Sequence, residues 1–332
     1  MLRASLLRPF ADRLSARGGD PQALAKRLGI DDRQERGAAG VTAAQVRSFC
    51  EQAARLAQDP GLGLNAALER PPGSFGMVEI ATRSAPDLKT ALQFRVDFSP
   101  LLNEGVEVYF EADEHEGRFG FQLAGDREGL GRHVNEFRLA STMLLFRALI
   151  GARFAPLRAW FSNTAAETRE ALEVLLRTTD LKFNQPDCGI AVSLRDLSRR
   201  SRRADPMAFE YWRKQAERRL PKQRETPFAD QLRRRLREQL AEGAPEMEKL
   251  AKQLHMSRRT LHRRLADEQL NFQTVVDELR RDLAERAVLH SDRGTEELAL
   301  SLGYADVPAF LRAFKRWTGM NPTGFRQRSL TS

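Results

Sequence analysis

Cysteine is the scarcest residue in this sequence, with only Cys50 and Cys188 among 332 residues. Two isolated cysteines exclude a disulfide scaffold in a chain of this length and are typical of a reducing compartment. Neither has a second cysteine nearby, so the clustered thiolate ligands of a zinc finger are excluded as well. We therefore predict a cytoplasmic protein without a structural metal.

Long apolar runs are also missing. The longest, Met143–Phe146, ends at Arg147 and is far shorter than the roughly 20 residues that span a bilayer. Near the N-terminus, Arg3 and Arg8 interrupt the apolar residues, which leaves no core for a signal peptide. The sequence thus predicts no membrane partner.

Motifs for catalysis are absent too. The sequence contains neither G-x-S-x-G nor a P-loop. Residues 60–66 come close to a dinucleotide-binding glycine pattern, but they follow a helical pattern rather than a strand. His115 and His133 are too irregularly spaced to indicate a metal site, and His115 is expected to be an exposed polar residue in a hairpin turn. We predict no enzyme activity, no catalytic residue, no metal and no cofactor.

Positive charge is in excess, and it is concentrated in the C-terminal part. Residues 1–200 contain 27 basic and 26 acidic side chains, a net charge of +1. Residues 201–332 contain 27 basic and 19 acidic side chains, a net charge of +8. A basic part beside a nearly neutral part indicates a polyanion-binding module attached to a second domain.

The polarity pattern divides the chain into three segments. Residues 1–195 mix helical periodicity with alternating runs, which predicts an α+β domain with helices on a small antiparallel or mixed sheet. Residues 196–227 are rich in arginine and predict a basic interdomain linker, either a solvated face or a phosphate contact. Residues 228–332 predict an all-α domain. In the first segment, we expect a hairpin from 106–110 and 118–123, helices at 88–102 and 134–150, and strands at 157–161, 181–184 and 189–194.

A helix-turn-helix pattern occurs twice in the all-α domain, at Leu250–Leu265 and at Leu298–Phe314. In each copy the second helix has apolar residues on one side and polar or basic residues on the other. A single copy would fit an amphipathic helix with a solvated basic face equally well. The repetition favours two helices that read one face of a DNA duplex.

In the first copy, His255-Met256 is the expected turn and Ser257 the N-cap of the second helix. Leu261 and Leu265 lie four residues apart and should face the core. The residues on the opposite face, where an arginine can bind guanine, are Arg259, His262, Arg263 and Ala266. The residues at the flanks, placed to contact phosphates, are Ser257, Arg258 and Arg264.

In the second copy, Gly303 supplies a turn residue that tolerates positive φ, and Asp306 can cap the second helix. Gly319 should end this helix, and Pro322 should prevent its return. The core residues are Phe310, Phe314 and Trp317. The outward residues are Pro308, Leu311, Arg312 and Lys315, and we expect Lys315 and Arg316 to contact phosphates.

A long amphipathic helix, Phe272–His290, joins the two copies. Its length should be about 28 Å at about 1.5 Å per residue. Successive major grooves on one face of DNA are about 34 Å apart, so such a rod could hold two helices in adjacent grooves. The residues on its shared apolar face are Phe272, Val275, Val276, Leu279, Leu283 and Ala287.

These residues carry a resemblance: the region from about 228 to 328 is similar to the DNA-binding domain of the AraC/XylS family of bacterial transcription regulators. The matching residues are Ala251, Ser257, Leu261, Arg263 and Leu265, then Ala299, Gly303-Tyr304, Phe310, Arg312–Lys315, Gly319, Pro322 and Phe325-Arg326. The resemblance implies base contacts at Arg259, His262 and Arg263 and at Pro308, Leu311 and Arg312. His255 departs from the family, which has glycine in the first turn. If that residue is left-handed, histidine costs about 1 kcal/mol.

Residues 1–195 more loosely resemble the effector-binding domain of one branch of AraC-type regulators, often labelled arabinose-binding-like. The resemblance lies in Pro72–Gly76, in the helix and hairpin that follow, and in Phe183–Leu194. It implies a domain that binds a small organic molecule and dimerises. The residues that would bind this effector cannot be assigned from the pattern.

We therefore expect a cytoplasmic, ligand-responsive activator of transcription. Its expected partners are promoter DNA, RNA polymerase, a small-molecule effector and a second copy of itself. Two alternatives stay open: a ligand-independent architectural DNA-binding protein, and a DNA-binding module fused to an enzyme-like domain. The alkyl-transfer repair proteins of the latter class need a cysteine cluster, which this chain lacks.

Overall fold

The computed structural model describes residues 2–30, 40–103, 105–123, 129–164, 167–220, 228–254, 256–268, 270–290 and 293–331. The chain divides into two compact units, residues 1–222 (unit 1) and residues 223–332 (unit 2). The predicted turn residue His255 and the linker residues 221–227 lie outside the described residues.

Unit 1 combines helices with one five-stranded sheet, which confirms the predicted α+β class. The strands lie in the order β1-β2-β5-β3-β4, and only the β3–β4 pair is parallel, so the sheet is mixed. The strands are β1 (Val106–Ala112), β2 (Glu116–Leu123), β3 (Arg158–Trp160), β4 (Leu181–Lys182) and β5 (Cys188–Ser193). The helices are η1 (Ala4–Leu7), α1 (Arg8–Ala16), α2 (Pro21–Arg27), α4 (Ala43–Leu56), α5 (Leu62–Glu69), α6 (Gly76–Ser84), α7 (Leu88–Asp97), η2 (Ser99–Leu101), α8 (Arg132–Ile150), α9 (Arg169–Leu176), α10 (Leu194–Leu197) and α11 (Pro206–Arg219).

The predicted hairpin is confirmed as β1 and β2. Its turn is fixed locally, because the Asp113 carboxylate accepts hydrogen bonds from the backbone N–H groups of His115 and Glu116. The His115 side chain is 72% exposed, as expected for a residue in this turn. The hairpin places Phe119 and Phe121 two residues apart, and hence on the same face of β2.

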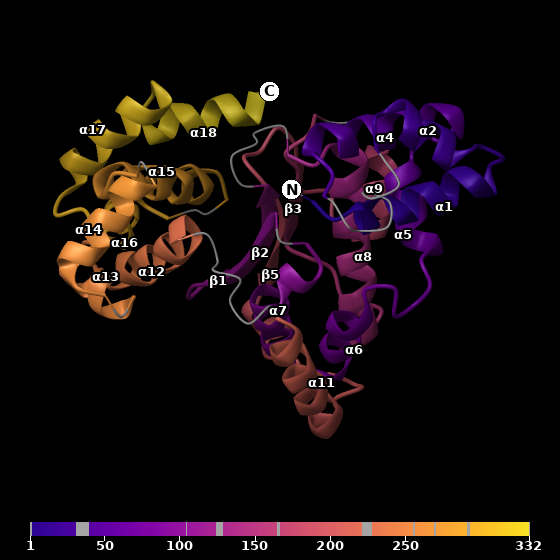
Figure 1. Cartoon of the computed structure of the whole chain (residues 1–332), viewed down its shortest axis with the longest axis horizontal. Helices are drawn as coiled ribbons and strands as arrows, with labels where there is room; N and C mark the ends of the chain where they lie inside the picture. Colours follow the sequence, from indigo (N-terminus) through magenta and orange to yellow (C-terminus); the bar gives the residue numbers. More distant parts are fainter. Residues whose placement is uncertain are drawn as a thin grey trace. The chain divides into compact units, whose positions relative to one another are not determined.

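Helix α8 is the central helix of unit 1. Residues on all its sides are buried, which is the pattern of a helix enclosed by other elements. It packs against α4, α5, α6, α7, α9 and the strand β5. Figure 1 shows α4, α5 and α8 gathered on one side of the sheet. Several of its polar residues, among them His133, Asn135 and Glu136, are therefore buried in the interior of unit 1.

One sequence-based expectation is modified in unit 1. The helix predicted at 88–102 is wrong beyond Asp97, where α7 ends and a short 3₁₀ turn, Ser99–Leu101, follows. Pro100 lies in that turn, and a proline cannot continue an α-helix because it lacks the N–H and its ring clashes with the preceding turn. In the expected linker, α11 is a regular helix that packs on α6 of unit 1.

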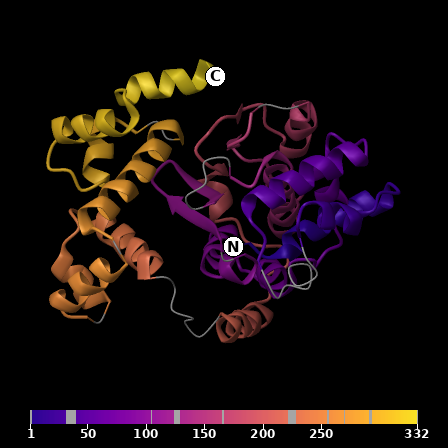
Figure 2. The same cartoon turned by 45° about the horizontal axis from the view of Figure 1, so that its top comes forward.

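Unit 2 is entirely helical among the residues described for it, as predicted (Figure 2, orange to yellow). Two apolar clusters form its core, and Leu283 of α15 packs against both of them. The helices are α12 (Phe228–Glu242), α13 (Met247–Gln253), α14 (Arg258–Asp267), α15 (Phe272–His290), α16 (Thr295–Ser301), α17 (Val307–Thr318) and α18 (Pro322–Thr331).

The described ranges contain neither a helix that could span a membrane nor a cluster of metal-binding side chains. No described helix is both long and apolar enough to cross a membrane. No group of three or more His, Cys, Asp or Glu side chains in those ranges is placed to hold a metal ion.

Candidate nucleic-acid interface

Helix α14 presents the first set of predicted base-contacting residues. Its start is fixed by Ser257, whose hydroxyl accepts a hydrogen bond of 3.1 Å from the backbone N–H of Thr260. Leu261 and Leu265 are 0% and 3% exposed and anchor the helix to the core. The opposite face, exposed to solvent, carries Arg259, His262 and Arg263. The local sequence thus fixes which side of α14 faces outward.

Helix α17 presents the second set in the same way. The Asp306 carboxylate caps it through a hydrogen bond of 2.6 Å from the N–H of Ala309, and Phe310 and Phe314 are fully buried. Gly319, at φ +78°, ends it in the left-handed conformation. Pro308, Arg312 and Lys315 are exposed, whereas Leu311 is half-buried and packs against the aromatic cluster.

The long helix α15 connects the two helix-turn-helix units through their cores. Its N-terminal half contributes Val275, Val276 and Leu279 to the apolar cluster with α12, α13 and α14. Its C-terminal half contributes Ala284 and Val288 to the cluster with α16 and α17. Figure 1 shows α15 running through unit 2 beside both sets of helices. One helix therefore sets the spacing between α14 and α17.

Three arginines at predicted base-contacting positions have no ion-pair partner in the described part of the chain. Within the described residues, no carboxylate lies within ion-pair distance of Arg259, Arg263 or Arg312, and all three side chains are exposed. An exposed arginine without an intramolecular partner can bind the O6 and N7 atoms of guanine without first breaking an ion pair. These side chains can bind a polyanion at little internal cost.

The flanking basic residues are held more tightly. The Arg264 guanidinium lies 5.0 Å from the centre of the Phe228 ring, and Arg316 forms an ion pair of 3.0 Å with Asp277 of α15. The Ser257 hydroxyl is already engaged in the cap. Arg258 and Lys315 are exposed. The predicted phosphate contacts thus include both fixed and free groups.

The turn of the second helix-turn-helix copy requires glycine for two reasons. Gly303 has φ +68°, which only glycine adopts without cost. A Cβ atom there would lie 2.6 Å from the carbonyl oxygen of Gly243 and 2.9 Å from its carbonyl carbon, in the loop after α12. The turn is therefore packed directly on the backbone of the loop after α12.

Sequence reasoning did not identify Arg280 as a residue of this turn. From α15 its guanidinium donates hydrogen bonds to the carbonyl oxygens of Leu302 (2.9 Å) and Gly303 (3.0 Å), and it lies 4.5 Å from the centre of the Tyr304 ring. These contacts hold the turn of the second helix-turn-helix copy against α15. Arg280 lies more than twenty residues before the residues that it contacts, so no local sequence pattern indicates the interaction.

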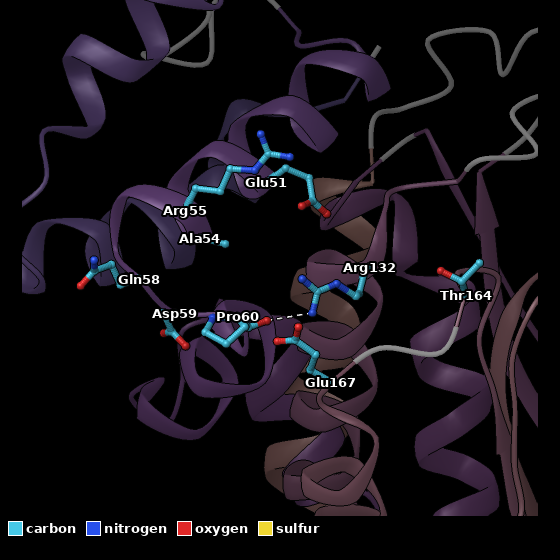
Figure 3. Close-up of a pocket in the computed structure, with 9 residues that line it drawn as sticks. All are labelled: Glu51, Ala54, Arg55, Gln58, Asp59, Pro60, Arg132, Thr164 and Glu167. Atoms are coloured by element: carbon cyan, nitrogen blue, oxygen red, sulfur yellow. Dashed lines mark hydrogen bonds between the residues drawn. The ribbon is translucent and has the colours of Figure 1, made fainter.

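Unit 1 contains an open, charged recess of about 590 Å³ between the end of α4 and the start of α8 (Figure 3). Arg132 points into it and donates a hydrogen bond of 2.8 Å to the carbonyl oxygen of Pro60. Its walls differ from the mostly apolar cleft that binds a small organic molecule. The lining residues are Glu51, Ala54, Arg55, Gln58, Asp59, Pro60, Arg132, Thr164 and Glu167.

Two buried titratable groups of α8 lie beside this recess. Burial raises the pKa of Glu136 to about 7, although its carboxylate accepts a hydrogen bond of 2.6 Å from the Thr168 hydroxyl. Burial, together with the charge of Arg132, lowers the pKa of His133 to about 4. Both shifts favour the neutral forms, as expected for a low-dielectric interior.

Comparisons with known proteins find two matching domain families. Residues 18–201 match the family described as "Arabinose-binding domain of AraC transcription regulator, N-term". Residues 250–328 match a family described as "Helix-turn-helix domain". The two matches fall on either side of the boundary between the structural units.

Several proteins are similar to this chain over most of their length. The HTH-type transcriptional regulator VirS of Mycobacterium tuberculosis is 28% identical over 98% of this chain and 96% of its own length. The ornithine utilization regulator of Pseudomonas aeruginosa is 25% identical over 82% of this chain and 80% of its own. Among solved structures, the transcriptional regulator CdpR from Pseudomonas aeruginosa matches with a TM-score of 0.43 and 20% identity, covering 96% of this chain and 97% of that one.

Proposed function

Because the chain belongs to the AraC family of transcription regulators and is not an enzyme, we propose that it reads promoter DNA with α14 and α17 in adjacent major grooves. The observation that carries this proposal is the pair of exposed helix faces on one scaffold, α15. Three arginines on these faces lack an ion-pair partner among the described residues.

We assign the base contacts to Arg259, His262 and Arg263 on α14 and to Pro308, Leu311 and Arg312 on α17. The α14 set holds two arginines and a histidine, and the α17 set holds one arginine. Hydrogen bonds to base edges discriminate between sequences more strongly than apolar contacts do. We therefore infer that α14 supplies most of the specificity and α17 mainly positions the protein.

Phosphate contacts are assigned to Ser257, Arg258, Arg264, Lys315 and Arg316. Two of them, Arg264 and Arg316, are held by Phe228 and Asp277 and are pre-positioned for a phosphate. Contacts of this type orient a protein on the duplex without reading its sequence, and they weaken as salt rises.

Control of DNA binding is assigned to the N-terminal part. In this proposal, residues 1–195 bind a small organic effector and dimerise, residues 196–227 form the linker, and residues 228–332 bind DNA and recruit RNA polymerase as an activator. The match to an arabinose-binding-like domain supports an effector of small size. The effector must bind two states of the protein unequally, and operator DNA must then alter its affinity reciprocally.

The test is a selection of genomic DNA fragments with the purified full-length protein at physiological salt, followed by sequencing. We expect a motif of two half-sites, each with two short blocks about one helical turn apart. A flat profile whose binding disappears as salt rises would favour the architectural alternative and would overturn sequence-specific regulation.

A further inference from the structure

Two arginines of unit 1 lie side by side in its interior, between two helices and the sheet. Arg95 of α7 lies with its guanidinium 5.7 Å from the centre of the Phe119 ring, and Arg138 of α8 lies 4.3 Å from the centre of the Phe121 ring. Phe119 and Phe121 share one face of β2, so both arginines approach the same face of the sheet. The pair is far along the chain from the DNA-reading helices.

Most guanidinium nitrogens of Arg95 are unsatisfied among the described residues. The Nε and Nη1 atoms of Arg95 are buried without a hydrogen-bond partner, and its Nη2 reaches the Thr142 hydroxyl only at 3.5 Å. The Ser141 hydroxyl, one helical turn from Arg138, is also buried without a partner. Within the described residues, no carboxylate forms an ion pair with Arg95 or Arg138.

Glu79 is a carboxylate with an electrostatic effect on Arg95, but it already forms ion pairs with two other arginines, Arg70 and Arg83. Glu79 accepts hydrogen bonds from Arg70 at 2.7 Å and from Arg83 at 2.8 Å, and from the backbone N–H groups of Gly73 and Phe75. The Glu79 carboxylate thus already pairs with two arginines other than Arg95. The region keeps an excess of positive charge.

Both arginines stay charged at neutral pH in spite of their burial. Burial lowers the pKa of Arg95 to about 10, and burial together with the charge of Arg95 lowers the pKa of Arg138 to about 10. Burying two like charges without a counter-charge is unfavourable. Buried charges without a counter-charge occur at functional sites, because a ligand of opposite charge can supply the counter-charge that the fold lacks.

We propose that Arg95 and Arg138 form the anion-binding end of the effector site, and that the effector is a small organic acid whose carboxylate or phosphate lies between the two guanidiniums. This inference rests on the proposed effector function of unit 1. A planar guanidinium donates two parallel hydrogen bonds to such a group, which makes the interaction both strong and specific. Both residues are half-buried as a whole, whereas the Nε and Nη1 atoms of Arg95 are fully buried.

The surroundings of Arg95 provide a physical route towards unit 2. Its neighbour Phe94 packs edge-on against Phe209 of α11, with ring centres 5.5 Å apart. Phe94, Phe98 and Ala216 of α11 belong to one apolar cluster. Helix α11 is the last described helix before unit 2. An anion that draws α7 and α8 together therefore acts on the element from which the chain leaves unit 1.

The test uses the full-length protein and two probe anions, sodium benzoate for the carboxylate and sodium phosphate for the phosphate, at ionic strength held constant with sodium chloride. Benzamide serves as the uncharged control for benzoate. Thermal unfolding and isothermal titration calorimetry are compared for the natural protein, for Arg95→Met and Arg138→Met, and for Arg17→Met. Arg17 is an exposed arginine of unit 1 and is the matched control.

We expect at least one anion to raise the unfolding temperature of the natural protein and of Arg17→Met, with no effect of benzamide. Each of the two site variants should weaken anion binding by about tenfold or more, because a charged hydrogen-bond donor is lost. Each should also unfold at a higher temperature than the natural protein without anion, because an uncompensated buried charge has been removed. Stronger binding of benzoate than of phosphate assigns a carboxylate, and the reverse assigns a phosphate.

Two results would overturn the site. One is an unchanged anion response in both site variants, which would place the anions on the basic DNA-binding helices instead. The other is the absence of any response at tens of millimolar anion. If a site variant fails to fold, Arg95→Lys and Arg138→Lys replace it, because lysine keeps the positive charge but lacks the paired N–H donors of the guanidinium. An undiminished anion response in both lysine variants would equally refute the proposed geometry.

Failure of the effector function is distinguishable from failure of the site. The affinity for a DNA fragment recovered from the genomic selection is measured with and without the bound anion. If anion binding depends on Arg95 and Arg138 but leaves the affinity for DNA unchanged, control of DNA binding by this anion is refuted. The anion-binding site itself is then still supported.

Discussion

The contact at Gly303 gives a quantitative prediction, because Gly319 provides a matched control. Gly303 follows α16 and Gly319 follows α17, and both have positive φ, +68° for Gly303 and +78° for Gly319. A Cβ at Gly319 would meet no heavy atom within 4 Å, whereas one at Gly303 would lie 2.6 Å from the carbonyl oxygen of Gly243. The two substitutions therefore differ in the close backbone approach.

For Gly319→Ala we expect only the cost of a left-handed non-glycine residue, about 1 kcal/mol. For Gly303→Ala the same cost applies, and a backbone shift to relieve the overlap adds about 1–3 kcal/mol. The hydrogen bonds of Arg280 to Leu302 and Gly303 would also be disturbed. The expected total for Gly303→Ala is about 2–4 kcal/mol.

Amide hydrogen exchange measured by mass spectrometry on the full-length protein resolves this difference, since it reports the opening free energy of individual segments. In peptides of α16 and α17, exchange should accelerate about fivefold in Gly319→Ala and about thirtyfold or more in Gly303→Ala. Peptides of unit 1 should be unchanged in both. Equal acceleration in the two variants would refute the close approach between the turn and the loop after α12.

Three further predictions concern DNA binding and pH. Arg263→Ala should cost about 1–3 kcal/mol and relax specificity at one base pair, whereas Arg17→Ala should change neither; equal weakening on all sequences in a binding selection would contradict the assignment. Burial of Glu79 opposes its ionisation, but hydrogen bonds from Arg70, Gly73 and Arg83 lower its pKa from 4.5 to about 2. Its ionised form therefore stabilises the fold above about pH 4.5, and this contribution should be lost as pH falls towards 2; Glu79→Gln should flatten that part of the stability profile in urea unfolding. Burial raises the pKa of Glu136 from 4.5 to about 7, so its contribution is fully present below about pH 4.5 and is lost as pH rises through 7. Glu136→Gln should thus gain stability relative to the natural protein at pH 8 compared with pH 5, and an equal difference at both pH values would contradict this.

Local chemistry made much of unit 2 predictable from the sequence. Ser257 and Asp306 cap their helices as expected, since each cap needs only a backbone N–H three residues away. The buried positions Leu261, Leu265, Phe310 and Phe314 follow from helical periodicity alone. Because the motif is local and occurs twice, the class of DNA-binding regulator followed from the same residues.

Longer-range contacts could not be predicted in this way. Helix α7 ends at Asp97 because of Pro100, which the apolar periodicity of 88–102 concealed. The order of strands in the mixed sheet depends on pairing between residues far apart, such as Phe119 with Ile190. The contacts of Arg280 with the second turn are of the same kind.

The sequence by itself determined that the described part of unit 2 is helical, which faces of α14 and α17 point outward, and that positive charge accumulates in the C-terminal part. Each of these depends on neighbours within one or two helical turns. Only the tertiary structure decided that Gly303 packs on Gly243 and that Arg95 and Arg138 meet without a counter-charge among the described residues. These pairs come from separate elements, and the energy of such a contact depends on distance and burial, which residue order alone does not encode.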